Sequence, residues 1–388
     1  MIYFDNAATR RVPDDILKKI IPYFIEEYGN ASAIYDLGRN AKRAIESSRE
    51  MVAKAINADP SEIYFTSSGT ESDNWAIKGI ASANKKKGKH IIVSAIEHHA
   101  ILEPCKYLQK NGFDISYIPV DRSGIVNVKD VEKLLQKDTI LISVMFANNE
   151  IGTIQPIAQI ADLAKKNGIY FHTDAVQAVG HVDIDVKKLG VDLLTISGHK
   201  LGGPKGVGAL YIKKGVKIDS LLHGGAQEMG RRASTENTPG IVGLGLAVQN
   251  SVKNMKKNNE YVKKLRDMAI EGILSKISDC FVNGDLVNRL PANVNVCFKY
   301  IEGESILLHL NHAGICASSG SACTSASLEP SHVLLAIGVK PEDAHGSLRL
   351  SFSEDNTVEE VEYLLDVLPK IVSKLRAMSP LYNSFKKK

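Results

Sequence analysis

From about residue 60 to residue 215, short apolar runs alternate with segments of helical periodicity such as residues 157–167. The apolar runs are nearly continuous rather than alternating, which is typical of strands that are covered on both faces. We therefore predict an α/β fold with a mostly parallel, seven-stranded sheet and helices on both of its faces. The seven runs are residues 62–66, 90–95, 115–120, 139–147, 168–174, 192–197 and 208–212.

The pattern changes after this region. Residues 239–275 predict one long helix or two successive helices, and helical periodicity returns from Val358. The strand-like runs in this part of the chain are residues 293–300, 314–319 and 347–353. This mixture predicts a second, smaller α+β domain that the N-terminal segment completes. The expected division is a large domain of residues 15–255 and a small domain of residues 1–14 and 256–388.

Composition and charge exclude several classes of protein. The chain has 388 residues, of which 44% are hydrophobic and 24% charged, as in ordinary globular proteins. The net charge is only +4, and lysine runs occur only at 85–87 and 386–388, so direct nucleic-acid binding is not expected. Apolar runs such as residues 140–147 are too short to cross a bilayer, and the first residues lack the pattern of a secretory signal.

Cysteine usage points to a reducing compartment. The five cysteines are an odd number without a CxxC pair, and no His/Cys cluster has metal-ligand spacing. We therefore expect reduced thiols, no bound metal and a cytoplasmic protein that does not associate with membranes.

Polar groups with a chemical use follow five of the predicted strands. In an open α/β sheet, ligands bind beyond the carboxyl ends of the strands, so these groups are expected to meet in one site. Loop composition alone rarely produces five such coincidences. The segments are SSGTESDN (67–74), IEHHA (96–100), NNEIG (148–152), DAVQAVG (174–180) and GHK (198–200).

The segment SSGTES (67–72) has the composition of a phosphate site. Its small residues allow a tight turn, and Thr70 is the expected N-cap of the helix that follows. Free backbone N–H groups and the positive end of the helix dipole suit a phosphate. An ordinary strand-to-helix turn accounts for the same residues. Because neither a Walker loop nor GxGxxG is present, a nucleotide is not indicated.

Three further residues narrow the choice of ligand. Asp174 ends a strand that is expected to be buried, where its carboxylate needs a cationic partner such as a protonated pyridine nitrogen. His98 follows another strand, and its flat ring can stack on an aromatic ligand. Lys200 lies at the mouth of a strand, where a partly apolar pocket makes an amine nucleophilic toward an aldehyde. Each residue alone has an ordinary structural explanation, but together with a phosphate cradle they predict pyridoxal 5'-phosphate (PLP) carried by Lys200.

The chain resembles the cysteine desulfurases of the NifS/IscS type, which belong to the class V aminotransferase group with PLP fold type I. Similar segments occur in the same order over nearly the whole chain. Two positions depart from the family pattern, because Tyr35 replaces the usual histidine and Ala31 the usual proline; these changes affect substrate-side contacts rather than the cofactor site. The similar segments are DNAAT (5–9), GNASAIYDLGR (29–39), FTSSGTESDNWAIKG (65–79), EHHA (97–100), NNEIGTIQPI (148–157), HTDAVQ (172–177), SGHKLGGPKGVGALY (197–211), SSGSACTSASLEPSHVLLAIG (318–338) and SLRLSFS (347–353).

The resemblance implies roles for the cofactor-site residues. Lys200 corresponds to the lysine that carries PLP, Asp174 to the partner of the pyridine nitrogen, and His98 to the stacking ring. Gln177 corresponds to the residue that binds the phenolic oxygen. Thr235, in GRRASTENTPG, corresponds to a threonine that reaches the phosphate in the neighbouring subunit, which implies a homodimer. The remaining phosphate positions are Gly69, Thr70, Ser197 and His199.

Substrate contacts and the catalytic cysteine are implied in the same way. Asn149 corresponds to a residue that contacts cofactor and substrate, and Arg349 and Asn30 to further substrate contacts. A guanidinium suits a carboxylate because its fork makes two parallel hydrogen bonds. Cys323 lies in a Ser- and Gly-rich segment (318–327) that predicts a flexible loop of the small domain, and it corresponds to the nucleophile that takes sulfur from the substrate. The other four cysteines lie in apolar patterns and are expected in the core: Cys105, Cys280, Cys297 and Cys316.

The implied reaction converts L-cysteine to L-alanine and leaves a persulfide on Cys323, with His98 as a candidate proton donor or acceptor. The sulfur would then pass to an acceptor protein such as an iron–sulfur scaffold, with tRNA thiolation and other thio-cofactor pathways as open alternatives. A selenocysteine lyase, an aminotransferase of the same fold and a non-catalytic scaffold are the rival functions. An aminotransferase does not need a cysteine in a Ser/Gly-rich loop, and Lys200 argues against a non-catalytic scaffold.

Overall fold

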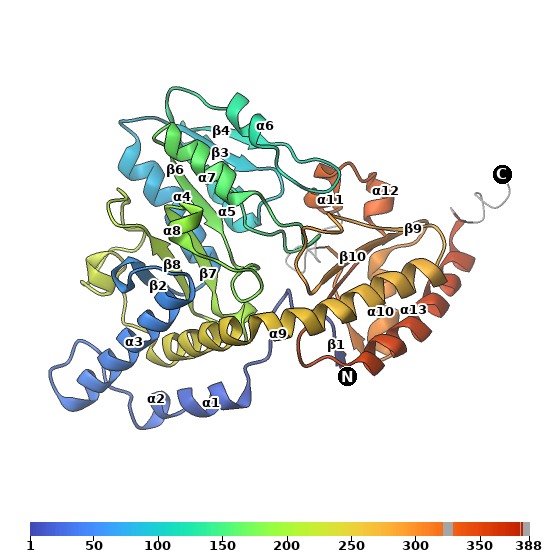
Figure 1. Ribbon diagram of the computed structural model, residues 1–388, viewed down its shortest axis with the longest axis horizontal. Coiled ribbons are helices and arrows are strands. Elements are labelled where there is room, and N and C mark those ends of the chain that lie inside the picture. The colour runs from blue at the N-terminus through green and yellow to red at the C-terminus, as the bar shows by residue number, and fades with distance from the viewer. Residues whose placement is uncertain (321–328, 381, 383–388) are drawn as a thin grey trace.

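The computed structural model describes residues 1–320, 329–380 and 382. Its largest sheet has seven strands in the order β2-β8-β7-β6-β5-β3-β4 (Figure 1). These strands coincide with the seven apolar runs of the sequence, with small differences at their ends. The strands are β2 (Ile63–Thr66), β3 (His90–Ser94), β4 (Asp114–Ile118), β5 (Thr139–Ser143), β6 (Tyr170–Asp174), β7 (Leu193–Ser197) and β8 (Gly208–Ile212).

This sheet is mostly parallel, as predicted. The neighbours β4, β3, β5, β6 and β7 pair in parallel, and only β8 runs antiparallel, to both β7 and β2. β8 follows β7 after a glycine-rich turn, which reverses the chain without a helical crossover. β2 therefore runs in the same direction as β7, and the carboxyl ends of β2 to β7 lie along one edge of the sheet.

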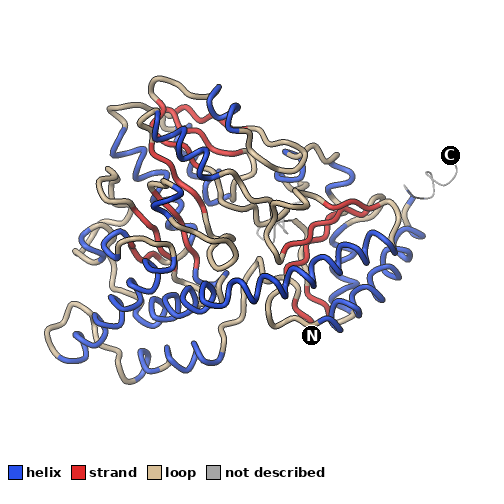
Figure 2. Tube along the Cα trace, viewed as in Figure 1, coloured by secondary structure: helices blue, strands red, loops and turns tan. Residues whose placement is uncertain are grey.

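Helices cover one face of the sheet near the predicted ligand edge (Figures 1 and 2). α4 (Gly69–Asn84) and α5 (His99–Lys110) each begin just after a strand. Trp75 and Ile77 of α4 belong to one buried cluster with strand residues such as Leu193. Packing of this apolar side holds the N-terminus of α4 against the sheet.

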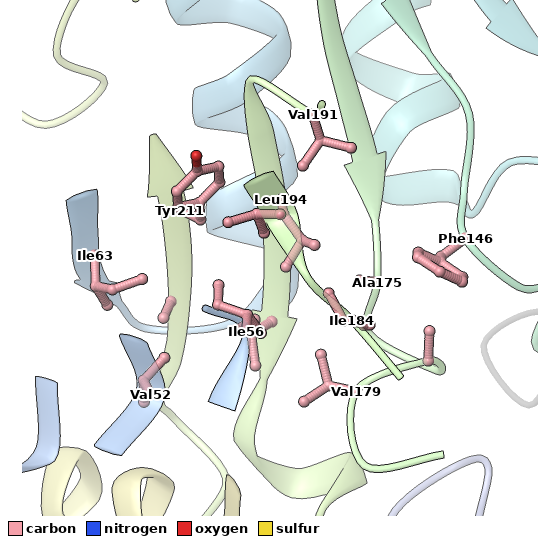
Figure 3. Packing of buried hydrophobic residues seen from close by; sticks show 14 of the residues in the cluster. Val52, Ile56, Ile63, Phe146, Ala175, Val179, Ile184, Val191, Leu194 and Tyr211 are labelled. Atoms are coloured by element: carbon pink, nitrogen blue, oxygen red, sulfur yellow. The ribbon is translucent and has the colours of Figure 1, made fainter. Parts of the chain in front are cut away.

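The opposite face is covered by α3 (Asp36–Ala55), α7 (Ile157–Lys166) and the first part of a long helix. Figure 3 shows part of this core, in which Ile56, just after α3, and Leu194 of β7 are fully buried in the same cluster. Because both faces are apolar, the strands read as continuous hydrophobic runs in the sequence.

A single helix, α9 (Thr238–Lys276), contains 39 residues and runs from the large sheet to the second one (Figure 1). The prediction of one long helix is therefore correct, and the alternative of two helices is wrong. Its first half contributes Leu244 to the core of the large sheet, and its second half contributes Leu265 to the core of the second sheet.

The second sheet is antiparallel, with the order β12-β10-β9. β10 (Asn293–Phe298) lies between β12 (Ser347–Ser351) and β9 (Cys280–Val282), and β9 was not predicted from the sequence. α10 (Gly303–His312) and α13 (Val358–Met378) share one buried cluster with this sheet and the end of α9. This is the smaller α+β unit that the pattern predicts.

The N-terminal segment packs against the second unit. β1 (Ile2–Tyr3) pairs in parallel with β11 (Ile315–Cys316). Phe4 is fully buried, and its ring meets that of Phe352 edge-on at a centroid distance of 5.0 Å. The following residues lie between the two sheets, where Asp5 forms a β-bridge with Ser351.

The remaining helices are short. In the described parts of the chain, no helix has the length and apolar character needed to span a bilayer. The short helices are α1 (Asp14–Ile20), α2 (Pro22–Ile25), α6 (Val128–Lys133), α8 (Val186–Leu189), α11 (His332–Ala336) and α12 (Pro341–Ala344), and 3₁₀ turns occur at Pro60–Glu62, Gly198–Lys200 and Glu228–Gly230.

Candidate active site

The carboxyl ends of β2, β3, β5, β6 and β7 meet around one cavity of about 200 Å³. All five polar segments that the sequence singled out contribute to its lining, and β12 of the second sheet adds one residue. The edge of the sheet therefore holds one site, as predicted. The predicted residues that line this cavity are Gly69, Thr70, His98, Asn149, Asp174, Gln177, Ser197, His199, Lys200 and Arg349.

Lys200 reaches the cavity because β7 ends at Ser197 and a single 3₁₀ turn follows. Its Nζ donates hydrogen bonds to the carbonyl oxygens of Ala7 (2.7 Å) and Ala8 (2.8 Å). The N-terminal segment thus positions the amine, a contact that the sequence did not predict. An amine held in this way can react with an aldehyde ligand in the cavity.

Asp174 is the last residue of β6 and is 6% exposed. Burial raises the pKa of its carboxyl to about 6, although the N–H of Val176 and the charge of Lys200 act in the opposite direction. The Val176 N–H donates to Asp174 Oδ1 at 2.9 Å. A carboxylate that is costly to bury gains from a cation placed beside it, and a protonated ring nitrogen is such a cation.

His98 is the N-cap of α5, and its Nδ1 accepts the N–H of Ala100 at 3.1 Å. Burial lowers the pKa of His98 to about 4, and the positive charge of Lys200 contributes. The ring is therefore neutral at pH 7. Because Nδ1 accepts a hydrogen bond, the proton of the neutral ring lies on Nε2.

The N-terminus of α4 borders the cavity. Ser68 caps the helix by accepting the N–H of Glu71, so the prediction of Thr70 as the N-cap is wrong; Thr70 lies within the first turn. The sequence pattern could not distinguish two hydroxyl residues that are both good caps. A Cβ on Gly69 would come within 3.0 Å of Val176 Cγ2 and 3.2 Å of Ser197 Cβ.

Arg349 brings the second sheet into the site. Its guanidinium is 1% exposed and donates to the carbonyl oxygen of Asn149 (3.1 Å) and to Asp5 (2.9 Å). Its Nε has no hydrogen-bond partner among the described residues. A buried donor without a partner is unusual and indicates a place for an anion such as a carboxylate.

The segment Asn6–Thr9 also orients two other lining residues. Gln177 Nε2 donates to the carbonyl oxygen of Ala7 at 3.0 Å. His199 Nδ1 lies 3.2 Å from Thr9 Oγ1, and burial together with the charge of Lys200 lowers the pKa of His199 to about 4. A short stretch near the N-terminus therefore touches three of the predicted site residues.

Two of the predicted residues that the structure describes do not contribute to this cavity. Asn30 and Thr235 are exposed and do not line it. Cys323 lies outside the described residues. For the other cysteines, the expected core position is correct for Cys105 and Cys297, which are buried, and wrong for the remaining two: Cys280 and Cys316 are only partly buried.

Several lining residues were not recognised in the sequence. Residues 145–147 were included in a predicted strand, but β5 ends at Ser143 and the chain then bends to border the cavity. Asp73 is an acidic residue among the apolar positions of α4, and this was a signal in the sequence that could have pointed to the cavity. The additional lining residues are Ala7, Ala8, Ser68, Asp73, Met145, Ala147 and Val176.

The cavity fits PLP. Lys200 provides an amine for the aldehyde, Asp174 a buried carboxyl for the ring nitrogen, and His98 a neutral ring on the cavity wall. The N-terminus of α4 suits the phosphate, and a Cβ at its Gly69 would crowd the neighbouring residues. Within the described residues, no group of three His, Cys, Asp or Glu side chains is arranged to hold a metal ion.

Comparison with known proteins gives a consistent result. Residues 2–364 match the family described as aminotransferase class-V. The chain is 59% identical over 380 residues to a protein of Methanosarcina thermophila named cysteine desulfurase IscS, covering 98% of this chain and 94% of that protein. It is 56% identical over 388 residues to a protein of the same name from Clostridium botulinum, covering 100% of this chain and 98% of the relative. A solved structure titled NifS-like protein superposes with a TM-score of 0.91 at 41% identity, covering 96% of this chain and 100% of that chain.

Proposed function

The chain belongs to the class-V aminotransferase family, and from this membership and the cavity we propose that it is a PLP-dependent cysteine desulfurase. The observation that carries the proposal is that Lys200, Asp174 and Arg349 line one cavity. Together they provide an amine, an acid and a carboxylate receptor for an amino acid. The proposed reaction takes sulfur from L-cysteine and releases L-alanine.

Lys200, Asp174 and His98 would hold the cofactor ring, and the N-terminus of α4 with Ser197 would hold its phosphate. When bound, PLP withdraws electrons from the Cα of the amino acid and so lowers the cost of removing its proton. Lys200 is the group proposed to take this proton, because its Nζ is held in the cavity by two carbonyl oxygens. Asp174 supplies the negative charge that keeps a ring nitrogen protonated.

Arg349 is proposed to bind the substrate carboxylate. Its Nε, which has no hydrogen-bond partner among the residues that the structure describes, is the proposed donor, while Asp5 and the carbonyl of Asn149 hold the rest of the guanidinium in place. This anchoring fixes the orientation of the amino acid, which is worth several kcal/mol in a well-positioned site. His98 is neutral at pH 7, so its ring is proposed to assist the reaction by hydrogen bonding through Nε2–H.

Cys323 is proposed as the sulfur acceptor. Its thiolate attacks the sulfur of the substrate, the new S–S bond forms, and the bond from that sulfur to the substrate Cβ breaks. The electron pair of the broken bond takes up a proton at Cβ, which gives alanine, and the persulfide stays on the protein. No external oxidant or reductant is required for this step.

We also propose a homodimer in which Thr235 reaches the cofactor phosphate of the other subunit. Thr235 is exposed in the single chain. Large apolar side chains are exposed along residues 24–34, with Phe24 63%, Ile25 64%, Tyr28 67% and Ile34 88% accessible. Apolar exposure concentrated in one segment favours a protein interface.

Two domains are proposed within each subunit, one of residues 15–255 and one of residues 1–14 and 256–388, the latter carrying Cys323. The separate buried clusters of the two sheets support this division. The proposed boundary falls inside α9, which contributes to both clusters.

The sulfur is proposed to leave the protein for an acceptor protein in the cytoplasm. The relatives are named cysteine desulfurase IscS, which favours an iron–sulfur scaffold as the acceptor. Transfer toward tRNA thiolation is the second candidate, and pull-down from native extract distinguishes the two.

The function is tested by supplying L-cysteine to the purified protein. Alanine and dithiothreitol-released sulfide are expected in equal amounts without any keto acid. Alanine that forms only when a keto acid is added would mean an aminotransferase instead. Borohydride treatment should fix the cofactor to the peptide that contains Lys200, and label on another lysine would contradict the assignment.

A further inference from the structure

A strip of polar side chains lies buried beneath the cavity, on the sheet face that α4 covers. Ser143 of β5, His172 of β6 and Thr195 of β7 lie on adjacent strands, and Asp73 of α4 lies against them. All four residues are at most 1% exposed. Apolar residues such as Trp75 and Leu193 pack on this face, so the hydrogen-bond partners of the strip decide what it costs to bury.

Hydrogen bonds connect the strip into a chain. Ser143 Oγ lies 2.9 Å from His172 Nδ1, and His172 Nε2 lies 3.0 Å from Thr195 Oγ1. Burial lowers the pKa of His172 to about 3, so its ring is neutral and has one N–H. The ring therefore donates to one of the two hydroxyl groups and accepts from the other, so the strip offers Asp73 no positive charge.

Asp73 lacks what a buried anion needs. Its Oδ1 has no hydrogen-bond partner among the described residues and lies 3.7 Å from the neutral His172 ring. Burial raises the pKa of Asp73 well above its ordinary value, and the negative charges of Asp174 and Glu97 add to this effect, while the Thr195 hydroxyl opposes it. The charged groups that face Asp73 are thus acidic.

Asp174 is the better location for a negative charge. Its Oδ1 accepts the Val176 N–H, and the charge of Lys200 favours its ionised form. Two neighbouring buried carboxyl groups do not readily ionise together, so one of them keeps a proton. The different surroundings of Asp73 and Asp174 determine which of the two carboxyl groups stays protonated.

We propose that Asp73 is a positioning residue that carries the proton of the buried pair Asp73–Asp174, so that the negative charge of the pair stays on Asp174 at the cavity. The strip places the neutral His172 ring, and no cation, beside Asp73 Oδ1. An ionised Asp73 would instead repel the charge on Asp174 and favour its protonation. The benefit to a cationic ring nitrogen rests on the proposed function, whereas the location of the proton does not.

Infrared spectroscopy of the full-length holoenzyme tests the location of the proton, because a protonated carboxyl gives an acid carbonyl band that a carboxylate lacks. At neutral pH we expect one such band to disappear in Asp73→Asn, which has the same shape but no acidic proton. The control Glu97→Gln is expected to remove a different band, because burial raises the pKa of Glu97 to about 8. Acid carbonyl bands that are unchanged in Asp73→Asn would overturn the proposal.

Two further measurements extend this test. Thr195→Val, which removes a hydroxyl that influences Asp73, should move the same band without abolishing it, and this holds even if Asp73→Asn does not fold. In Asp73→Asn the pH midpoint of the cofactor's visible absorbance should stay within about 0.3 units of wild type, whereas loss of an ionised neighbour would shift it by about one unit or more. The infrared result is independent of cysteine turnover, so a protein that shows the Asp73 band but produces no alanine would refute the proposed function alone.

Discussion

Lys200 changes the protonation of the residues around it. Its charge contributes to the lowered pKa of His98, about 4, and opposes the rise in the pKa of Asp174, about 6. The cavity at pH 7 thus contains an amine, a neutral imidazole and an acid close to its titration range. Groups with separated proton affinities in one cavity are typical of sites that move protons.

Cys323→Ser should separate cofactor binding from sulfur transfer. Lys200 and Asp174 do not depend on the thiol, so the variant should keep the visible absorbance of the bound cofactor. A serine hydroxyl is almost entirely un-ionised at neutral pH, so alanine formation should fall by a factor of about 100 or more. Mass spectrometry after one turnover should find one added sulfur on the Cys323 peptide of wild type. Cys316→Ser is the matched control and should keep full activity. Extra sulfur on the Cys316 peptide would show that Cys323 is not the nucleophile.

Asp174→Asn should change the pH dependence of stability in the cofactor-free protein. The pKa of Asp174 is raised from 3.8 to about 6, so the folded state binds this proton more tightly than the unfolded state. The resulting stabilisation is fully present below pH 4 and is lost as the pH rises through 6. The free energy of unfolding of Asp174→Asn should therefore exceed that of wild type at pH 8 by on the order of 1 kcal/mol, and this difference should narrow toward pH 4. A higher thermal unfolding temperature of the variant at pH 8 would show it. The same variant should bind PLP more weakly, and parallel pH curves for the two proteins would contradict this account.

At the scale of elements, two sets of contacts fix the start of α4: its apolar side packs against the sheet, and Gly69 contacts Val176 and Ser197. The helix begins at Gly69, directly after β2, and its apolar side is buried against the sheet. A Cβ on Gly69 would lie 3.0 Å from Val176 Cγ2 and 3.2 Å from Ser197 Cβ, so any side chain here would push these neighbours away by a few tenths of an ångström. Because the backbone of Gly69 is helical, this close approach, and not an unusual backbone conformation, favours glycine.

Gly69→Ala should weaken PLP binding by roughly tenfold, because the added methyl group forces apart the residues that form the cradle, at a cost of about 1 kcal/mol or more. Fluorescence titration of the cofactor-free protein measures the change. The double variant Gly69→Ala/Val176→Ala removes the contact at 3.0 Å and should recover part of the affinity. Equal affinities for the single variant and wild type would show that the cradle is not at this helix end.

At the scale of the whole molecule, the site is completed by distant parts of the chain. Arg349 and Asp5 are 344 positions apart, and Lys200 and Ala7 are 193 apart, yet both pairs form hydrogen bonds. The second sheet and the N-terminal segment thus form one wall of the cavity. The proposed homodimer extends this principle to the neighbouring subunit.

Thr235→Ala should reduce PLP affinity in the dimer without changing its assembly, with a loss of about 1 kcal/mol for one hydrogen bond. Phe24→Asp, in the exposed apolar segment, should instead shift the protein toward monomers in analytical ultracentrifugation. Ser234→Ala, at an adjacent exposed position, is the control for the first variant. A fully active monomer, or unchanged cofactor affinity in Thr235→Ala, would refute the shared site.

The sequence by itself determined the seven strands of the large sheet and the polar residues at their carboxyl ends. Periodicity and turn composition are local properties, and the rule that ligands bind at the carboxyl ends of parallel strands then brings Lys200, Asp174 and His98 together. Only the tertiary structure decided that Ala7 and Ala8 hold Lys200, that Asp5 pairs with Arg349, and that Asp73 lies over a buried polar strip. Such contacts depend on strand order and register and on the packing of a helix across several strands, which arise when distant segments bury their apolar faces together.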